Sequence, residues 1–226
     1  MNPPPIETPS GKDAGGENFP VGSVLLPAAL RPHVAAFYGF ARAADDIADN
    51  PALEPDDKIA RLNRMAEAIE GGHAGDSALA KAHLMRDSLA ATGVTPRHCL
   101  DLLDAFRQDA AKRRYADWDE VIAYCMRSAA PVGRYLMDLH GEDRALRPAA
   151  DALCNALQLL NHLQDCGEDY REMDRVYIPE PWLAEEGLGV EALAMAASPP
   201  SSVRSSTRRR TASTGYLMRP GRWPAA

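Results

Sequence analysis

Apolar side chains recur at helical spacing along most of the chain. Between Pro27 and Asp49 an apolar residue returns every three or four positions, which predicts a helix with one buried face. No stretch alternates apolar and polar residues as a half-buried strand does, and no repeat is recognisable. The pattern therefore predicts an all-α fold. The predicted helices cover residues 27–49, 55–70, 77–92, 96–113, 117–140, 147–172 and, as a short helix, 189–197.

Turn and capping residues indicate where these helices begin, end or bend. Gly93 follows the third helix, and glycine accepts the left-handed conformation that ends many helices. Asp117 is the expected N-cap of the fifth helix. Pro131 removes a backbone donor inside that helix, which predicts a kink or break near residues 129–130. Residues 179–181 begin and end with proline, so we expect a turn there.

Composition and charge divide the chain into three parts. Residues 1–16 are rich in Pro and Gly, which predicts a disordered or loosely attached segment. Residues 17–198 carry the helical pattern and are the predicted domain. Residues 199–226 contain six of the 25 Lys and Arg and none of the 32 Asp and Glu, so residues 1–198 carry a net charge of −13. This basic tail has no apolar period. It is interpreted as a disordered tail or as the product of a frame shift near residue 198 that truncates the helical domain.

The composition also excludes several classes of protein. A body this acidic is a poor binder of nucleic acid, because the phosphate backbone repels it. The four cysteines form no C-x-x-C pair, so we expect free thiols in a reducing cytosol. Neither a signal peptide nor a run of about 18 apolar residues is recognisable, which predicts a cytoplasmic protein without a membrane-spanning helix.

Two acidic clusters lie 120 positions apart and have the same internal spacing. The first contains Asp45, Asp46 and Asp49 and lies just before Asn50-Pro51, where the helix is expected to stop. Carboxylates at i and i+4 stack on one helix face and repel each other, and the C-terminal end of a helix also disfavours negative charge. The second cluster repeats the spacing on another predicted helix and consists of Asn161, Asp165 and Asp169.

Runs of acidic residues often form only a solvated helix face. Because the same repulsion between carboxylates occurs on two predicted helices, we expect the negative charge to have a function. Mg²⁺ takes carboxylate oxygens and substrate phosphates together. We therefore expect the clusters to face each other across a helical bundle and to hold Mg²⁺ on a diphosphate. Arg42 and Arg175 flank the clusters, and arginine geometry suits phosphate oxygens. Gln158 lies among leucines, where a buried amide needs partners. Tyr38 and Tyr177 are interpreted as core residues or as aromatic walls that stabilise a cation.

Both clusters lie in longer runs that resemble one protein family. Residues 37–49 read Phe-Tyr-Gly-Phe-Ala-Arg-Ala-Ala-Asp-Asp-Ile-Ala-Asp, and residues 158–169 read Gln-Leu-Leu-Asn-His-Leu-Gln-Asp-Cys-Gly-Glu-Asp. Together with residues 175–179, these runs resemble the two aspartate-rich motifs of the squalene/phytoene synthases. Residues 17–21, Glu-Asn-Phe-Pro-Val, resemble the hopanoid-pathway branch of the family, which forms hydroxysqualene. The resemblance covers residues 16–197.

The resemblance implies an isoprenoid synthase helical bundle and Mg²⁺-dependent ionisation of a prenyl diphosphate. For the hydroxysqualene branch it implies presqualene diphosphate as substrate, a cation that rearranges and is captured by water, and functional partners in squalene formation. The greasy substrate adds the expectation of peripheral contact with the inner membrane face. By position, the implied metal ligands are Asp45, Asp49, Asn161, Asp165 and Asp169. The implied catalytic residues are Tyr38, Arg42, Asp46 and Tyr177, and the implied substrate-binding residues are Asn18, Phe19, Gln158 and Arg175.

Two alternatives stay open on the sequence. A phytoene or presqualene diphosphate synthase, which condenses two prenyl diphosphates, resembles the same motifs. An inactive remnant that only binds prenyl diphosphate is the second alternative, because members of the family continue with further helices where this chain has its basic tail. Ala130 also stands where the hydroxysqualene branch usually has Asn, which removes one polar contact.

Overall fold

The computed structural model describes Ile6 and residues 26–195, and helices account for most of this part of the chain. No strand occurs among these residues, so the predicted all-α class is confirmed. The α-helices are α1 (Arg31–Asp49), α2 (Pro55–Ile69), α3 (Ala80–Thr92), α4 (Arg97–Ala111), α5 (Trp118–Ser128), α6 (Ala130–His140), α7 (Arg147–Met173), α8 (Glu180–Ala184) and α9 (Ala192–Met195). Two short 3₁₀ helices, Ser77–Leu79 and Arg144–Leu146, lead into α3 and α7.

Local signals in the sequence placed most helix ends correctly. Gly93 ends α3 in the left-handed conformation with φ +71°. The carboxylate of Asp117 accepts the N–H of Glu120 at 2.8 Å and caps α5. The expected break before Pro131 is also present, because α5 and α6 are separate helices that meet at Ala129.

Two expectations about local structure need correction. Residues 179–181 do not form a simple turn but lead into α8, where Pro181 occupies the first turn and loses no hydrogen bond there. Residues 77–79 form a 3₁₀ turn rather than the first turn of α3. Ile6 is described apart from its neighbours: its side chain is 3 % exposed, and its carbonyl accepts Arg61 Nη1 at 3.3 Å. The other residues of the segment expected to be loosely attached lie outside the described residues.

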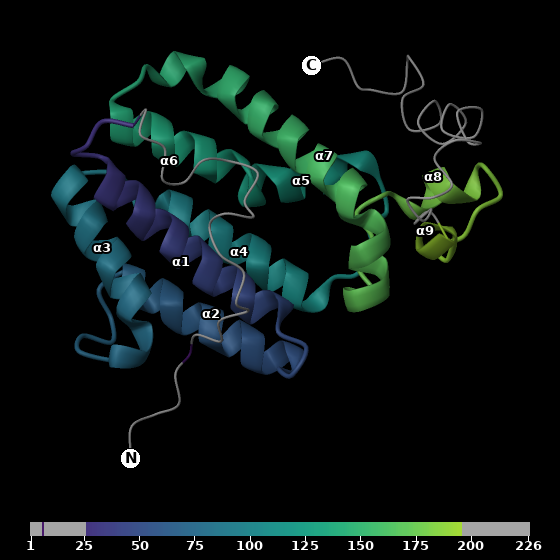
Figure 1. Ribbon diagram of the computed structural model, residues 1–226, viewed down its shortest axis with the longest axis horizontal. Coiled ribbons are helices and arrows are strands. Elements are labelled where there is room, and N and C mark those ends of the chain that lie inside the picture. The colour runs from purple at the N-terminus through teal and green to yellow at the C-terminus, as the bar shows by residue number, and fades with distance from the viewer. Residues whose placement is uncertain (1–5, 7–25, 196–226) are drawn as a thin grey trace, which may run out of the picture.

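The main core lies where α1 packs against α3 and α4, and where α2 packs against α3 and α4 (Figure 1). Phe40, Ile47 and Leu62 are fully buried in this core. Phe37 stacks on Tyr135 of α6 with ring centroids 4.0 Å apart, which joins α1 to the second half of the bundle. The consequence for function is that α1 is held rigidly along its buried face.

Helix α7 is the longest helix and lies at the edge of the bundle, against α5 and α6 (Figure 1). His162 is its only buried residue. Leu153, Leu157 and Leu160 are each about half exposed and share one face of the helix, at 61 %, 53 % and 47 %. Within the described residues, α7 therefore has one packed side and one uncovered apolar side.

The four cysteines are free, in agreement with the predicted free thiols. Burial raises the pKa of the Cys99 thiol to about 12, which makes it an unreactive core residue. Across residues 26–195, no helix is both long enough and apolar enough to cross a membrane.

The close approach of α6 and α7 depends on Gly133. A Cβ atom at this position would lie 2.6 Å from Cys154 Sγ, whereas a Cβ atom at Gly39 of α1 would meet nothing within 4 Å. We expect Gly133→Val to lower the free energy of unfolding by about 1–3 kcal/mol, because overpacking forces the helices apart. Adding Cys154→Ala should restore part of the loss. Urea unfolding followed by circular dichroism measures both effects.

Gly39→Ala is the matched control for this prediction. This substitution also adds a Cβ atom to a helical glycine, but the Cβ atom contacts no other residue. We therefore expect the free energy of unfolding to stay unchanged or to rise by up to about 1 kcal/mol. Equal destabilisation by both variants would contradict a specific contact between α6 and α7.

Candidate active site

The two acidic clusters line one cavity of about 960 Å³. Helix α1 presents Asp45, Asp46 and Asp49 from one wall, and α7 presents its acids from the other. The structure therefore brings together two ladders that are far apart in the sequence. The α7 residues that line the cavity are Gln158, Asn161, His162, Asp165, Glu168, Asp169, Glu172 and Met173.

The rest of the cavity wall is mainly apolar and comes mostly from α1, α4 and α6, with single tyrosines from α5 and from the segment after α7. Phe37, Leu102 and Leu136 are typical of this part, which is continuous with the acidic part. One end of the space is thus suited to charged groups and the other to a hydrocarbon chain. The other apolar and aromatic residues on this wall are Val34, Tyr38, Ala41, Phe106, Tyr124, Val132 and Tyr177.

Arg42 neutralises part of the ladder on its own helix. Its guanidinium pairs with Asp45 at 3.0 Å and with Asp46 at 2.8 Å, one turn further along α1. The Asp46 side chain is only 7 % exposed, whereas that of Asp45 is 34 % exposed because it faces the cavity. Arg42 therefore lies among carboxylates, and Asp46 holds it there.

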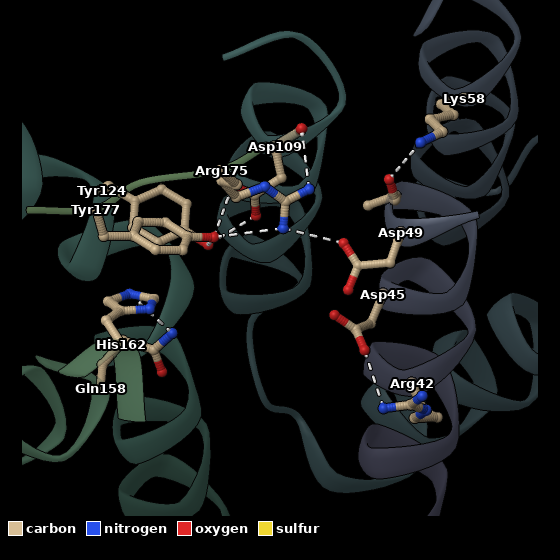
Figure 2. Close-up of polar contacts among 11 residues, drawn as sticks. Arg42, Asp45, Asp49, Lys58, Asp109, Tyr124, Gln158, His162, Arg175 and Tyr177 are labelled. Atoms are coloured by element: carbon tan, nitrogen blue, oxygen red, sulfur yellow. Dashed lines mark hydrogen bonds and ion pairs between the residues drawn. The ribbon is translucent and has the colours of Figure 1, made fainter. Parts of the chain in front are cut away.

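Arg175 is a buried link between three segments of the chain. Its Nη1 donates to Asp49 Oδ1 at 3.0 Å, and its Nη2 donates to the main-chain carbonyl of Asp109 at 3.1 Å (Figure 2). The turn that delivers it contains Asp174 in the left-handed conformation (φ 52°), and the N–H of Val176 then donates to the carbonyl of Arg113, just after α4. Although burial opposes its charge, the acidic groups around it raise the pKa of Arg175 above the ordinary value.

A second buried polar cluster lies beside Arg175. The carboxylate of Asp109, 3 % exposed, accepts hydrogen bonds from the hydroxyls of Tyr124 at 2.7 Å and Tyr177 at 3.2 Å. The ring of His162 stacks on Tyr177 with centroids 3.6 Å apart, and Gln158 Nε2 lies 3.3 Å from His162 Nε2 (Figure 2). Burial, with a smaller effect from Arg175, lowers the pKa of His162 to about 3, so the imidazole is neutral at pH 7.

The facing carboxylates retain protons more strongly than free carboxylic acids do. Burial and the neighbouring Asp49 raise the pKa of Asp45 to about 7. Burial raises the pKa of Asp169 to about 7 as well, with Asp165 and Asp49 adding to the effect and Arg175 opposing it. Burial likewise raises the pKa of Asp109 to about 6. Such shifts indicate a site that binds cations, because a bound cation returns the carboxyls to their charged form.

The donor set fits Mg²⁺ bridged by a substrate rather than a closed metal cage. Within the described residues, no three His, Cys, Asp or Glu lie close enough to form a ready-made metal cluster. Mg²⁺ is commonly bound by one or two carboxylates together with substrate phosphates and water, and the two acidic ladders offer such carboxylates from both walls.

Most of the candidate residues found in the sequence line this cavity, whereas Asn18 and Phe19 lie outside the described residues. Arg175 and Arg42 were expected on phosphate oxygens, but here both are paired with aspartates. The lining candidates are Tyr38, Arg42, Asp45, Asp46, Asp49, Gln158, Asn161, Asp165, Asp169, Arg175 and Tyr177.

Sequence reasoning missed several polar residues of the site: Asp109, Tyr124, His162, Glu168 and Glu172. A signal was available for Asp109, because it follows Leu102 and Ala105 on the buried face of α4, where a carboxylate needs partners. His162 carries no local signal in the sequence, because its stacking partner Tyr177 lies in the segment after α7.

Comparison with known proteins leads to the family that the acidic motifs resemble. The family model described as "Squalene/phytoene synthase" matches residues 12–222. A hydroxysqualene synthase from Rhodopseudomonas palustris is 48 % identical over 198 residues, which are 88 % of this chain and 67 % of that protein. A phytoene synthase from Rhodobacter capsulatus is 34 % identical, over 86 % of this chain and 58 % of that protein.

The fold also matches a solved structure. The crystal structure of squalene synthase HpnC from Alicyclobacillus acidocaldarius superposes with a TM-score of 0.68 at 28 % identity and covers 88 % of this chain and 75 % of that chain. The chain spans about two thirds or less of the length of the curated relatives it matches.

The raised pKa of Asp45 predicts how stability depends on pH in the metal-free chain. The folded pKa is about 7 and the unfolded value is 3.8, so the folded state binds the extra proton. Stability contributed by this carboxyl therefore increases as pH falls from about 7 to about 4 and is lost as pH rises through 7. Because the side chain is one third exposed, solvent screening reduces the effect, and we expect Asp45→Asn to raise the melting temperature at pH 8 by about 2–4 °C.

Thermal unfolding at pH 5 to 8 in EDTA, followed by circular dichroism, measures this effect. Asp104→Asn is the control, because Asp104 also pairs with an arginine of its own helix, at 2.6 Å from Arg107, but does not line the cavity. If the Asp45→Asn chain melts no higher than the unmodified chain at pH 8, the ionised carboxyl of Asp45 does not destabilise the folded state.

Proposed function

Because the chain belongs to the squalene/phytoene synthase family, we propose that it ionises presqualene diphosphate and forms hydroxysqualene and diphosphate. The observation that carries the proposal is that two carboxylate ladders, on α1 and α7, line one cavity whose other end is apolar. In the proposed reaction the C–O bond to the diphosphate breaks and leaves a cyclopropylcarbinyl cation. The cation rearranges, and water adds to it with loss of a proton to give hydroxysqualene.

The proposed metal is Mg²⁺, held by Asp45 and Asp49 on one wall and by Asn161, Asp165 and Asp169 on the other. The chemistry that Mg²⁺ supplies at this place is neutralisation of the diphosphate, which assists its departure as a leaving group. The support from the structure is the donor set and the raised pKa values of Asp45 and Asp169. No nucleic acid is proposed as a partner, because the domain is acidic.

The proposed roles of the arginines follow from their ion pairs. Asp46 fixes Arg42 beside Asp45, so that Arg42 moderates the charge of the ladder and meets the outer phosphate oxygens. Arg175 keeps Asp49 in place from the opposite side of the cavity and, with Gln158, belongs to the proposed substrate-binding set. Both arginines thereby add fixed positive charge at the diphosphate end.

The apolar end has a separate role in the proposed reaction. Phe37, Leu102 and Leu136 exclude water from the hydrocarbon chains and let the cation survive long enough to rearrange. Tyr38 and Tyr177 present aromatic rings next to this region, and electron-rich rings attract cations. The proposed substrate is strongly hydrophobic, and on this ground alone we propose that the protein makes peripheral contact with the inner membrane face.

The domain organisation remains a proposal as well. We assign the synthase domain to residues 17–198 and regard residues 199–226 as a basic tail, which lies outside the described residues.

The choice of substrate is testable directly. We expect the chain to convert presqualene diphosphate to hydroxysqualene with Mg²⁺ and without NADPH, with products identified by mass spectrometry. The higher identity to a hydroxysqualene synthase than to a phytoene synthase supports this expectation. Turnover of farnesyl or geranylgeranyl diphosphate, with no reaction of presqualene diphosphate, would favour the condensing synthases instead. Binding without turnover of any of these would favour the inactive remnant.

Removing one carboxylate from either ladder should stop diphosphate release. We expect Asp45→Asn and Asp165→Asn each to lower the release rate at least about 100-fold, because electrostatic stabilisation of the leaving group is lost. Helical content by circular dichroism should stay near that of the unmodified chain. Asp104→Asn, outside the cavity, is the control and should retain full activity. Retained release in both ladder variants would rule out the proposed metal site.

A further inference from the structure

The large apolar side chains that are exposed to solvent are concentrated on one side of α7. Six such side chains occur among the described residues, and four of them belong to α7 or to the residue just before it. Single exposed leucines are common on protein surfaces, but a contiguous apolar stripe marks a surface that another molecule covers. We call these four residues the leucine seam: Leu146, Leu153, Leu157 and Leu160.

The spacing of the leucine seam is that of a coiled coil. Successive leucines are seven, four and three positions apart, and this alternation keeps one face of a helix against a partner helix. At a rise of 1.5 Å per residue, the seam extends over about 20 Å. The exposed positions beside the leucines are small, which lets a second helix approach closely: Ala149, Ala152 and Ala156. The surface therefore fits another helix.

The leucine seam lies outside the cavity, although it shares α7 with the second acidic ladder. Gln158 and Asn161, each next to a seam leucine in the sequence, line the cavity, whereas none of the four leucines does. Helix α7 packs against α5, α6 and α9 through its other positions and lies at the edge of the bundle (Figure 1). A helix bound to the seam would thus leave the cavity lining in place and hold α7 from its uncovered side.

The leucine seam is complementary to a second copy of itself in the antiparallel direction. When Leu157 of one helix faces Leu160 of the other, a two-fold axis relates the two helices, so the reciprocal contact forms as well. Both central contacts are then leucine against leucine. In the same register, Leu153 of each copy lies opposite Gln164 of the other.

The charges at the two ends of α7 also favour the antiparallel direction. Residues 165–173 contain four acids and one base, a net charge of −3. Residues 142–147 contain two acids and two arginines, and the side chain of Arg144 is 77 % exposed. Parallel pairing would bring two acidic ends together. Antiparallel pairing places each acidic end beside the arginines of the other copy.

Other occupants fit the leucine seam less well. Residues 199–226 contain one leucine and no apolar period, so they offer no matching helix face. An anionic membrane surface would attract apolar side chains but would repel residues 1–198, which carry a net charge of −13. A second copy meets both requirements, because it supplies the same leucine spacing and the opposite order of charges.

We propose that the leucine seam is a dimer interface, in which two copies of this chain pair their α7 helices antiparallel with Leu157 of each copy against Leu160 of the other. The pairing covers the apolar side of α7 that the described residues leave exposed. It goes beyond the proposed reaction, because the oligomeric state is measured without substrate. The interface holds α7, which carries the second acidic ladder, from both sides.

Sedimentation velocity of the full chain over about a hundredfold range of concentration tests the interface. We expect a dimer, and we expect Leu157→Glu to raise its Kd at least about tenfold, because the symmetric interface loses a buried leucine from each copy. Leu84→Glu is the matched control. Leu84 is similarly exposed but lies on α3, so its substitution should change the Kd by less than about twofold. Circular dichroism checks that both variants fold.

Cross-linking through introduced cysteines tests the direction of the pairing. A mixture of Leu153→Cys chains and Gln164→Cys chains should form a mixed disulfide under mild oxidation, because the antiparallel register places these positions opposite each other. Leu153→Cys alone should not link to itself, since the two copies of this position lie about 16 Å apart along the helices. The unmodified chain is the blank, because Cys154 and Cys166 are partly exposed.

Each alternative occupant gives a different result. A chain that is monomeric at every concentration overturns the proposal. If Leu157→Glu then lowers the melting temperature of the monomer, the seam is covered by a segment of the same chain, and if it abolishes binding to phosphatidylglycerol vesicles, the seam contacts a membrane. A dimer that both glutamate variants weaken equally overturns the proposed interface, and a Leu153→Cys chain that links to itself overturns the antiparallel direction.

A second variant keeps the test decisive. If Leu157→Glu does not fold, Leu153→Glu decides by the same criterion, since Leu153 is also exposed on the seam. The proposed function is judged separately, by release of diphosphate from presqualene diphosphate.

Discussion

The site is governed by the repulsion between carboxylates that face each other across a partly desolvated cavity. The α1 ladder is partly neutralised by protein cations, because Arg42 pairs with Asp45 and Asp46, and Arg175 pairs with Asp49. The α7 acids, Asp165, Glu168, Asp169 and Glu172, have no ion pair among the described residues. The negative charge of the α7 wall is therefore not compensated by protein cations. A cation bound at this wall would also face the carboxyl of Asp45, which is one third exposed. Burial, aided by Asp165 and Asp49, raises the pKa of Asp169 to about 7 even though Arg175 opposes the shift.

The same constraint shapes the fold around the ladders. Three acids near the end of α1 oppose the helix dipole, and Lys58 of α2 compensates by donating its buried amine to the carbonyl of Ala48 at 2.8 Å. Arg175 joins the ends of α1 and α4 to the turn that follows α7. The positions of the catalytic candidates and the packing of the helix ends are thus fixed by one set of buried charges. For this reason substitutions in the site are expected to affect stability as well as chemistry.

The helices, the break before Pro131 and the Asp117 cap could be predicted from the sequence, because each depends on neighbours within about one helical turn. The repeated spacing of the acids predicted that the two acidic ladders line one cavity. Residues 179–181 were mispredicted as a turn because proline also suits the first turn of a helix. The partners of Arg175 and the roles of Asp109 and His162 could not be predicted in the same way. The partners of Arg175 lie 66 and 126 residues away, and Asp109 and His162 depend on contacts with other helices or with the segment after α7, which no local pattern encodes.

The cavity separates two demands that a diphosphate-ionising synthase must meet together. The leaving group needs positive charge, which the acid ladders concentrate by holding cations, while the hydrocarbon cation needs negative potential without a nearby nucleophile. A free carboxylate at the apolar end would satisfy the second demand but would also attack the cation or remove its proton. The carboxylate of Asp109 is buried, and its oxygens are occupied by hydrogen bonds from Tyr124 and Tyr177, so it is not free to attack a cation.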